Sequence, residues 1–190
     1  MATHLAFSAD YDALAKHYLE TVRANFASQK RLADRALAQL DNSQLYVALA
    51  AEDNSIAIII KHLHGNMRSR WRDFLTTDGE KPNRYRDSEF ETPPNDRASL
   101  MALWEEGWQT LFEALDSINA NTINSTITIR TQEHSVLEAI ERQLAHYSHH
   151  VGQIVYVAKS LKGHTWQTLS IAKGQSGHYD PAQHPKGRQV

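Results

Sequence analysis

The segment Leu144–Ile154, LAHYSHHVGQI, combines three histidines with apolar residues at helical spacing. Residues i and i+4 are neighbours on one face of a helix, so His146 and His150 are expected side by side. At about 100° per residue, both rings lie on one flank of the helix's apolar stripe, roughly 80–120° from the centre of that stripe. His149 falls on the opposite side of the helix, toward solvent. The stripe consists of Ile140, Leu144, Tyr147, Val151, Ile154 and Ala158. Neutral imidazole is the commonest metal ligand, so His146 and His150 are candidate ligands.

The helix that contains this segment is expected from about Ser135 to Leu161. Before it, Thr122–Arg130 alternates polar and β-branched residues, which predicts a short extended arm or hairpin rather than part of a sheet. After it, Lys162–Val190 is rich in Gly, His, Lys and Gln. We expect an irregular tail there, packed up to about Tyr179 through Trp166, Leu169 and Ile171.

Three further helices are predicted from the spacing of apolar residues. The first runs from Asp10, its N-cap, to about Leu40; the second starts at Asn54 or Ser55 and runs to about Phe74; the third starts at Asn95 or Asp96 and runs to Leu115. The stripe of the first helix contains Leu14, Tyr18, Val22, Phe26, Leu32, Leu37 and Leu40, and Trp71, Trp104 and Trp108 are expected in the core.

Four long amphipathic helices predict an all-α fold, a four-helix bundle. The long loop Thr76–Asp96 permits a crossover instead of a simple up-and-down order. We expect one domain over residues 1–179 and a flexible C-terminal tail over 180–190.

Composition excludes several classes of function. With 41% hydrophobic and 22% charged residues and a net charge of −2, the 190-residue chain has no basic block for nucleic acid. It contains no cysteine, which removes disulfides, thiolate nucleophiles and zinc–cysteine sites. Neither a signal peptide at MATHLAFSADYD nor a membrane span is expected, so the predicted location is cytoplasmic.

A third metal ligand is offered by the second helix, which contains His62 and His64. The two histidines lie on opposite edges of its apolar stripe. Helical geometry does not separate them and slightly favours His64. A helix that is merely rich in histidine would show the same His146–His150 spacing.

The motifs of the chain resemble the DinB-like (YfiT-like) superfamily of metal-binding four-helix bundles, and most closely a branch of unknown function. The matching segments are Ser55–Met67 (SIAIIIKHLHGNM), Arg70–Thr76, Asp78–Lys81, Thr128–Arg130, Val136–Ile140, Arg142–Tyr147, His150–Tyr156, Lys159, Leu169–Ile171, Lys173–Gly174 and Ser176. One departure is Pro82, where the family usually carries a tryptophan.

The resemblance implies which histidines are ligands. In its pattern the histidine before Leu-x-Gly-Asn binds the metal, which selects His62 and gives the triad His62, His146 and His150. The position of His149 is usually an aromatic residue there. The implied cofactor is one divalent ion, zinc or nickel first and iron or copper next. Some relatives in the wider superfamily are zinc-dependent thiol transferases or isomerases, which implies a low-molecular-weight thiol as co-substrate, and superfamily members often form homodimers.

Two functions remain open from the sequence. One is a metal-dependent transferase or hydrolase acting on a small molecule; the other is a non-catalytic, stress-associated binding module. Candidate general bases are Asp73, Glu80 and Glu89, and no catalytic residue is assigned. Asn66 and Gln153, one helical turn from proposed ligands, are expected to orient an imidazole or a water. Arg70 and Arg142 are candidate partners for a substrate carboxylate.

Overall fold

The structure is a computed structural model that describes residues 9–178, and it is mostly helical with one small sheet. The long helices are α1 (Ala9–Leu37), α2 (Ile56–Trp71), α3 (Arg97–Ser117) and α4 (Val136–Lys162). The two strands are β1 (Thr126–Ile129) and β2 (Gln132–Ser135). Short 3₁₀ helices lie at η1 (Ser43–Tyr46), η2 (Asp87–Phe90), η3 (Gly163–Thr165) and η4 (Ser176–His178).

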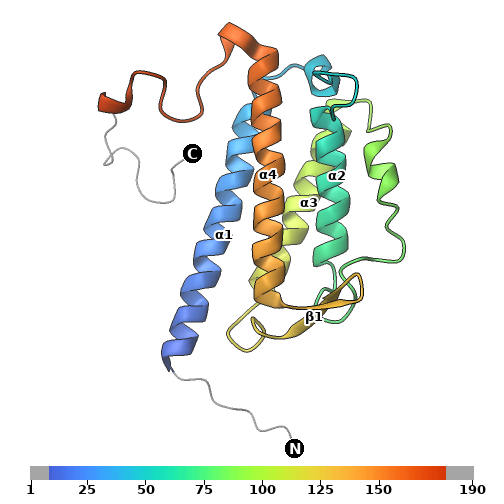
Figure 1. Ribbon diagram of the computed structural model, residues 1–190, viewed down its shortest axis with the longest axis vertical. Coiled ribbons are helices and arrows are strands. Elements are labelled where there is room, and N and C mark those ends of the chain that lie inside the picture. Colours follow the sequence, from blue (N-terminus) through green and yellow to red (C-terminus); the bar gives the residue numbers. More distant parts are fainter. Residues whose placement is uncertain (1–8, 179–190) are drawn as a thin grey trace, which may run out of the picture.

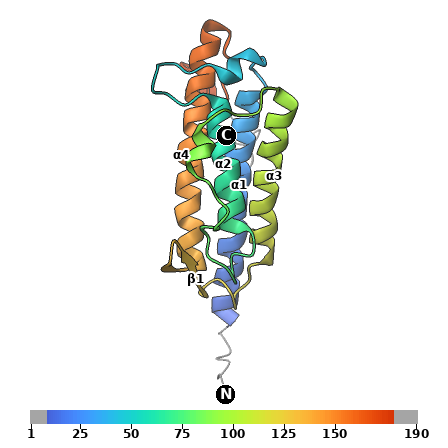
Figure 2. The same cartoon turned by 90° about the vertical axis from the view of Figure 1, so that its right-hand side faces the viewer.

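The four long helices lie side by side, with α1 and α2 at opposite corners (Figures 1 and 2). Helix α1 contacts α3 and α4, and α2 contacts the same two helices. In Figure 1, α1 and α4 run upward while α2 and α3 run downward. The chain between α2 and α3 must therefore return along the length of the molecule, which is the crossover that the long loop permits. This return places residues 76–96 over the outer face of α2.

Side-chain caps begin three of the helices where the sequence predicted them. Ser55 accepts a hydrogen bond from the Ile58 N–H at the start of α2, and Asp96 accepts one from Ser99 at the start of α3. Ser135 and Glu138 form a capping box at the start of α4. The prediction for α1 is wrong: the helix already includes Ala9, so Asp10 lies in the first turn, where its charge favours the helix dipole.

The core contains most of the predicted apolar positions. Trp71, Trp104 and Trp108 are at most 3% exposed. Two predictions are wrong. Leu14 is 65% exposed because it lies on the solvent side of α1, where the next residue, Ala15, is only 5% exposed, and Ile171 is 44% exposed. The tail packs through Leu169 and the half-buried Trp166. The predicted flexible segment 180–190 lies outside the described residues.

Strands β1 and β2 form an antiparallel hairpin, one of the two predicted alternatives for this segment. Ile129 pairs with Gln132, which leaves Arg130 and Thr131 as a two-residue turn. Both turn residues have positive φ (55° and 62°), a conformation usually occupied by Gly or Asn. The carboxylate of Asp78 stabilises the turn by accepting both of their backbone N–H groups, at 2.9 and 2.8 Å. The hairpin tip is thereby fixed to the start of the long loop.

No helix within residues 9–178 has the length and apolar character needed to cross a membrane.

Candidate metal centre

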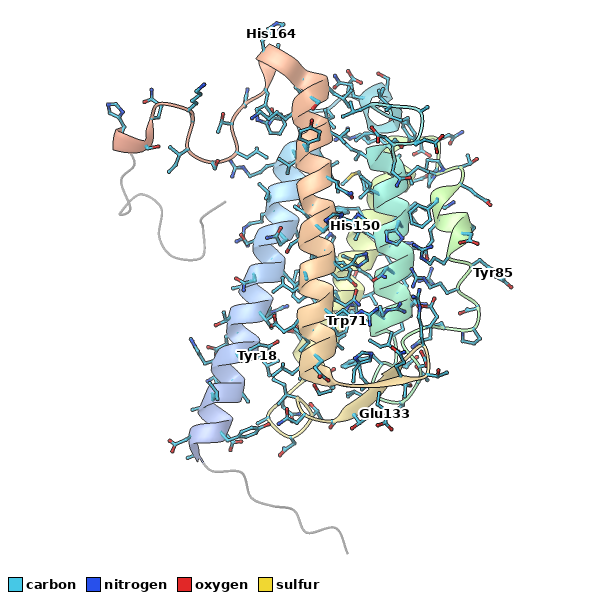
Figure 3. All side chains as sticks on the ribbon, in the orientation of Figure 1. Tyr18, Trp71, Tyr85, Glu133, His150 and His164 are labelled. Atoms are coloured by element: carbon cyan, nitrogen blue, oxygen red, sulfur yellow. The ribbon has the colours of Figure 1, made fainter. Side chains whose placement is uncertain are left out.

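Three imidazoles converge between α2 and α4, from His62 on α2 and from His146 and His150 on α4. Figure 3 shows His150 in the space between these two helices. The Nε2 atom of His146 lies 3.1 Å from that of His150 and 3.4 Å from that of His62. One ligand atom from each ring lies within 4.8 Å of the others. Nitrogen ligands about 2.0–2.1 Å from a tetrahedral ion are about 3.3 Å apart, so this spacing suits one metal ion.

The Nδ1 atoms of His62 and His150 are already engaged in hydrogen bonds. The Nδ1–H of His62 donates to Glu89 Oε2 at 2.8 Å, and the Nδ1–H of His150 donates to Gln153 Oε1 at 2.7 Å. Their Nε2 atoms therefore carry lone pairs that face His146. A neutral His146 has a single ring proton, which cannot satisfy both neighbours equally. A cation at the centre would satisfy all three rings, so the residues fit a divalent metal ion.

Two of the rings are held in the neutral form that a metal requires. Burial, with the nearby His150 and His62 rings, lowers the pKa of His146 to about 3. Burial also lowers the pKa of His150 to about 4, against the raising effect of its hydrogen bond with Gln153. Both imidazoles are thus neutral at pH 7, with their lone pairs available for coordination.

Glu89 links the long loop to His62. The side chain is 6% exposed and lies on η2, which packs on α2. Arg84 binds both of its oxygens, with Nε–Oε1 at 2.7 Å and Nη2–Oε2 at 2.9 Å. Burial raises the pKa of Glu89, but the hydrogen bonds from His62 and Arg84 outweigh it and the net effect is a lowered pKa. An ionised Glu89 fixes the tautomer of His62, as carboxylates do beside metal-ligating histidines.

The sequence Lys61-His62-Leu63-His64-Gly65-Asn66 holds this loop in place. Lys61 Nζ donates to the carbonyl oxygen of Ser88, within η2, and to that of Thr92, just after it. Gly65 leaves room for Glu89, since a Cβ at position 65 would lie only 2.3 Å from Glu89 Oε1. The glycine of the Leu-x-Gly-Asn motif is therefore needed for the close approach of the carboxylate.

A buried chain of hydrogen bonds sets α2 against α4 beside the triad. Trp71 Nε1–H donates to the Tyr147 hydroxyl at 3.0 Å, and that hydroxyl donates to Asn66 Oδ1 at 3.0 Å. Tyr147 follows His146 directly and is fully buried. Asn66 thus positions α4 through Tyr147 and makes no hydrogen bond to an imidazole within residues 9–178. Its predicted contact with a bound water stays a prediction. Gln153 contacts His150 as predicted.

The remaining candidates lie away from the triad. His64, which helical geometry slightly favoured, pairs instead with Glu106 at 3.0 Å. His149 is exposed, as predicted, and its Nε2 accepts from Gln153 Nε2 at 3.2 Å. Asp73 is exposed at the end of α2, and Glu80 forms ion pairs with arginines. Of the three proposed carboxylates, only Glu89 contacts a histidine of the triad.

A cavity of about 230 Å³ adjoins the triad on the side of His62 and His146. The sequence predictions included two of its arginines, Arg70 and Arg142. They missed three others, which come from the long loop and from the hairpin tip. The complete lining is His62, Asn66, Arg70, Arg84, Arg86, Arg130, Arg142, Gln143 and His146.

Comparison with known proteins identifies the family but no function. Neither the curated proteins nor the solved structures contain a match to this chain. The family model described as "Protein of unknown function (DUF1572)" matches residues 13–175, which include all three histidines and every residue that contacts them. The chain therefore belongs to the DUF1572 family.

Proposed function

We propose that this protein binds one divalent metal ion through His62, His146 and His150, and that it uses the ion in a transferase or hydrolase reaction on a small molecule. We further propose that it shares the four-helix-bundle fold of the DinB-like superfamily. The observation that carries the proposal is the convergence of three Nε2 atoms at the separations expected of ligands to one ion.

The protein's own residues prepare the site for coordination. Glu89 and Gln153 hold His62 and His150 in the tautomer that directs Nε2 inward. Phe90 lies against the His62 ring, with centroids 4.7 Å apart, and restricts its rotation. When bound, a divalent ion with three protein ligands supplies Lewis acidity at an open position, where it lowers the pKa of water or a thiol or polarises a substrate oxygen.

The lining of the cavity favours a thiol transferase over a hydrolase. Among the described residues no carboxylate lines the cavity, and Glu89 is engaged by His62 and Arg84. A thiol, with a pKa of about 8.5, needs less help from a base than water does. The absence of a carboxylate from the described lining also supports the second candidate, a non-catalytic binding module that keeps the metal site.

Elemental analysis of protein purified without a nickel column tests the metal site. Wild type is expected to carry about one equivalent of a divalent metal, and His62→Ala and His150→Ala to lose it. His64→Ala and His149→Ala are matched controls, since each changes a neighbouring histidine outside the triad. Both controls should retain the metal.

A metal-free wild type whose thermal stability is unchanged by added zinc would refute the proposal. If the metal is present, the loaded protein is to be screened for thiol conjugation and for hydrolysis of small esters. Activity that disappears in His150→Ala supports the enzyme, and inactivity on both reactions favours the binding module. The homodimer stays a prediction, to be tested by the mass of the protein in solution.

A further inference from the structure

We propose that the cavity beside the triad binds the oxyanion group, a carboxylate or a phosphate, of a small molecule next to the metal. This inference rests on the proposed function for the position of the metal, and on the arginines for the class of ligand. It identifies the substrate or ligand of the centre as an anion.

Two parallel rows of side chains lead from the imidazoles into the cavity. On α2 the row is His62, Asn66 and Arg70, and on α4 it is His150, His146 and Arg142, each at intervals of four residues. Because α2 and α4 run in opposite directions, both rows lead from histidine to arginine toward the hairpin end of the molecule (Figure 1). A molecule that contacts the metal would therefore extend toward guanidinium groups.

Five arginines from four different segments line this one cavity. Arg70 comes from α2, Arg142 from α4, Arg130 from the hairpin turn, and Arg84 and Arg86 from the loop. Guanidinium groups present several N–H donors in a planar fork that matches carboxylate and phosphate oxygens. Like charges repel one another, so such a cluster is costly unless anions balance it.

The protein's carboxylates balance only part of this charge. Glu80 pairs with Arg70, Arg84 and Arg130, and Glu89 pairs with Arg84. Asp78 also lies at this end, but its oxygens accept backbone N–H groups.

Two arginines keep donors for a ligand. Arg142 is exposed, and its side chain makes no hydrogen bond or ion pair within residues 9–178. Arg86 lies over the Phe90 ring at 5.0 Å, and the nearest carboxylate oxygen, from the fully exposed Asp87, is 3.9 Å away.

Buried polar atoms in the lining are also unsatisfied. Arg70 is 6% exposed, and its Nε–H has no acceptor among the described residues. Gln143 is 3% exposed, and its Oε1 has no donor. Buried polar groups are normally hydrogen-bonded. The Nε–H of Arg70 is a donor that an oxyanion would satisfy, whereas Oε1 of Gln143 is an acceptor and calls for a donor, such as a hydroxyl group elsewhere on the ligand. The volume of about 230 Å³ lies below the ordinary range of sites for drug-sized ligands, which limits the ligand to a small molecule or to one anionic end of a larger one.

Isothermal titration calorimetry with malonate and inorganic phosphate, at constant ionic strength, tests the inference. We expect wild type loaded with zinc to bind at least one of the two probes, and the neutral malonamide not to bind. The stronger of the two identifies carboxylate or phosphate as the preferred group. Arg142→Gln should weaken binding about ten- to hundredfold, as expected for loss of a charge-assisted hydrogen bond, and should retain its zinc.

Arg23→Gln is the matched control, since Arg23 is a surface arginine of α1 that pairs with Asp116 away from the cavity. It should bind the anions as wild type does. Absence of binding, or equal binding by Arg142→Gln, would overturn the anion site while zinc content upholds the metal site. A wild type that takes up no zinc but binds an anion in an Arg142-dependent manner would support the anion site and overturn the metal proposal.

Discussion

Replacing Gly65 by alanine tests whether the long loop prepares the metal site. The new Cβ would lie 2.3 Å from Glu89 Oε1 and 2.7 Å from Glu89 Cδ. Carbon atoms of this kind essentially never approach closer than 3.0 Å, and ordinary contact begins at 3.4 Å. The carboxylate must therefore retreat by about 1 Å. That shift would lengthen the 2.8 Å bond to His62 Nδ1 beyond hydrogen-bonding range.

We expect Gly65→Ala to weaken metal binding and to leave folding unchanged. Loss of a partner that orients a ligating histidine typically lowers metal affinity about 10–100-fold, or about 1.4–2.7 kcal/mol. Alanine favours the interior of a helix over glycine by about 0.5–1 kcal/mol, and this gain partly offsets the disturbance of Glu89. The helical circular dichroism signal should therefore be unchanged, while zinc affinity, measured by competition with a chromophoric chelator, falls.

Gly152→Ala is the matched control, because Gly152 also lies in a helix, two residues after His150, and a Cβ there meets nothing within 4 Å. It should leave zinc affinity unchanged. Glu89→Ala should reproduce the effect of Gly65→Ala, and the double variant should be no worse than Glu89→Ala alone. Wild-type affinity in Gly65→Ala, or additive losses in the double variant, would refute the role assigned to Glu89.

Three further predictions concern the site, the hairpin and α4. An ordinary imidazole of pKa about 6.5 is about 90% protonated at pH 5.5, and each such ligand loses about tenfold in zinc affinity there. Since His146 and His150 have pKa values near 3 and 4, both rings stay neutral at pH 5.5. Chelator competition should therefore show no loss of zinc affinity from these two rings between pH 7.5 and 5.5. A loss of affinity above a hundredfold would contradict this. Asp78→Ala should lower the free energy of unfolding in urea by about 1–3 kcal/mol, because backbone N–H groups of the hairpin turn lose their acceptor; an unchanged midpoint would contradict the assigned role. Ser135→Ala removes one half of the capping box and should cost about 1 kcal/mol in the same assay, whereas Ser160→Ala near the other end of α4 should cost less.

The sequence was sufficient for predictions that depend on neighbours along one helix. The spacing of His146 and His150 placed both rings on one flank of α4, and the same arithmetic placed His149 toward solvent. Cap residues act on N–H groups within three residues, so the sequence could narrow the cap of α2 to Asn54 or Ser55 and the start of α4 to about Ser135.

Helical spacing could not predict which residue of one helix faces another helix. His62 and His64 are equivalent in sequence terms, and helical geometry slightly favoured His64, which lies outside the cluster and pairs with Glu106. The distinction depends on which edge of α2 faces α4, and that is set by the burial of Tyr147 and its bond to Asn66. The choice of His62 from the resemblance agrees with the cluster in the structure.

The four helices, most of their caps and two of the three converging imidazoles could be predicted from the sequence, because periodicity and capping are local. The structure was needed to show that Glu89, not Asp73 or Glu80, contacts His62, and that Arg130 reaches the same cavity as Arg70. These groups are far apart in the chain. They meet because α2 and α3 run in the same direction, so the connecting loop must return over α2, and because Asp78 fixes the hairpin tip to that loop.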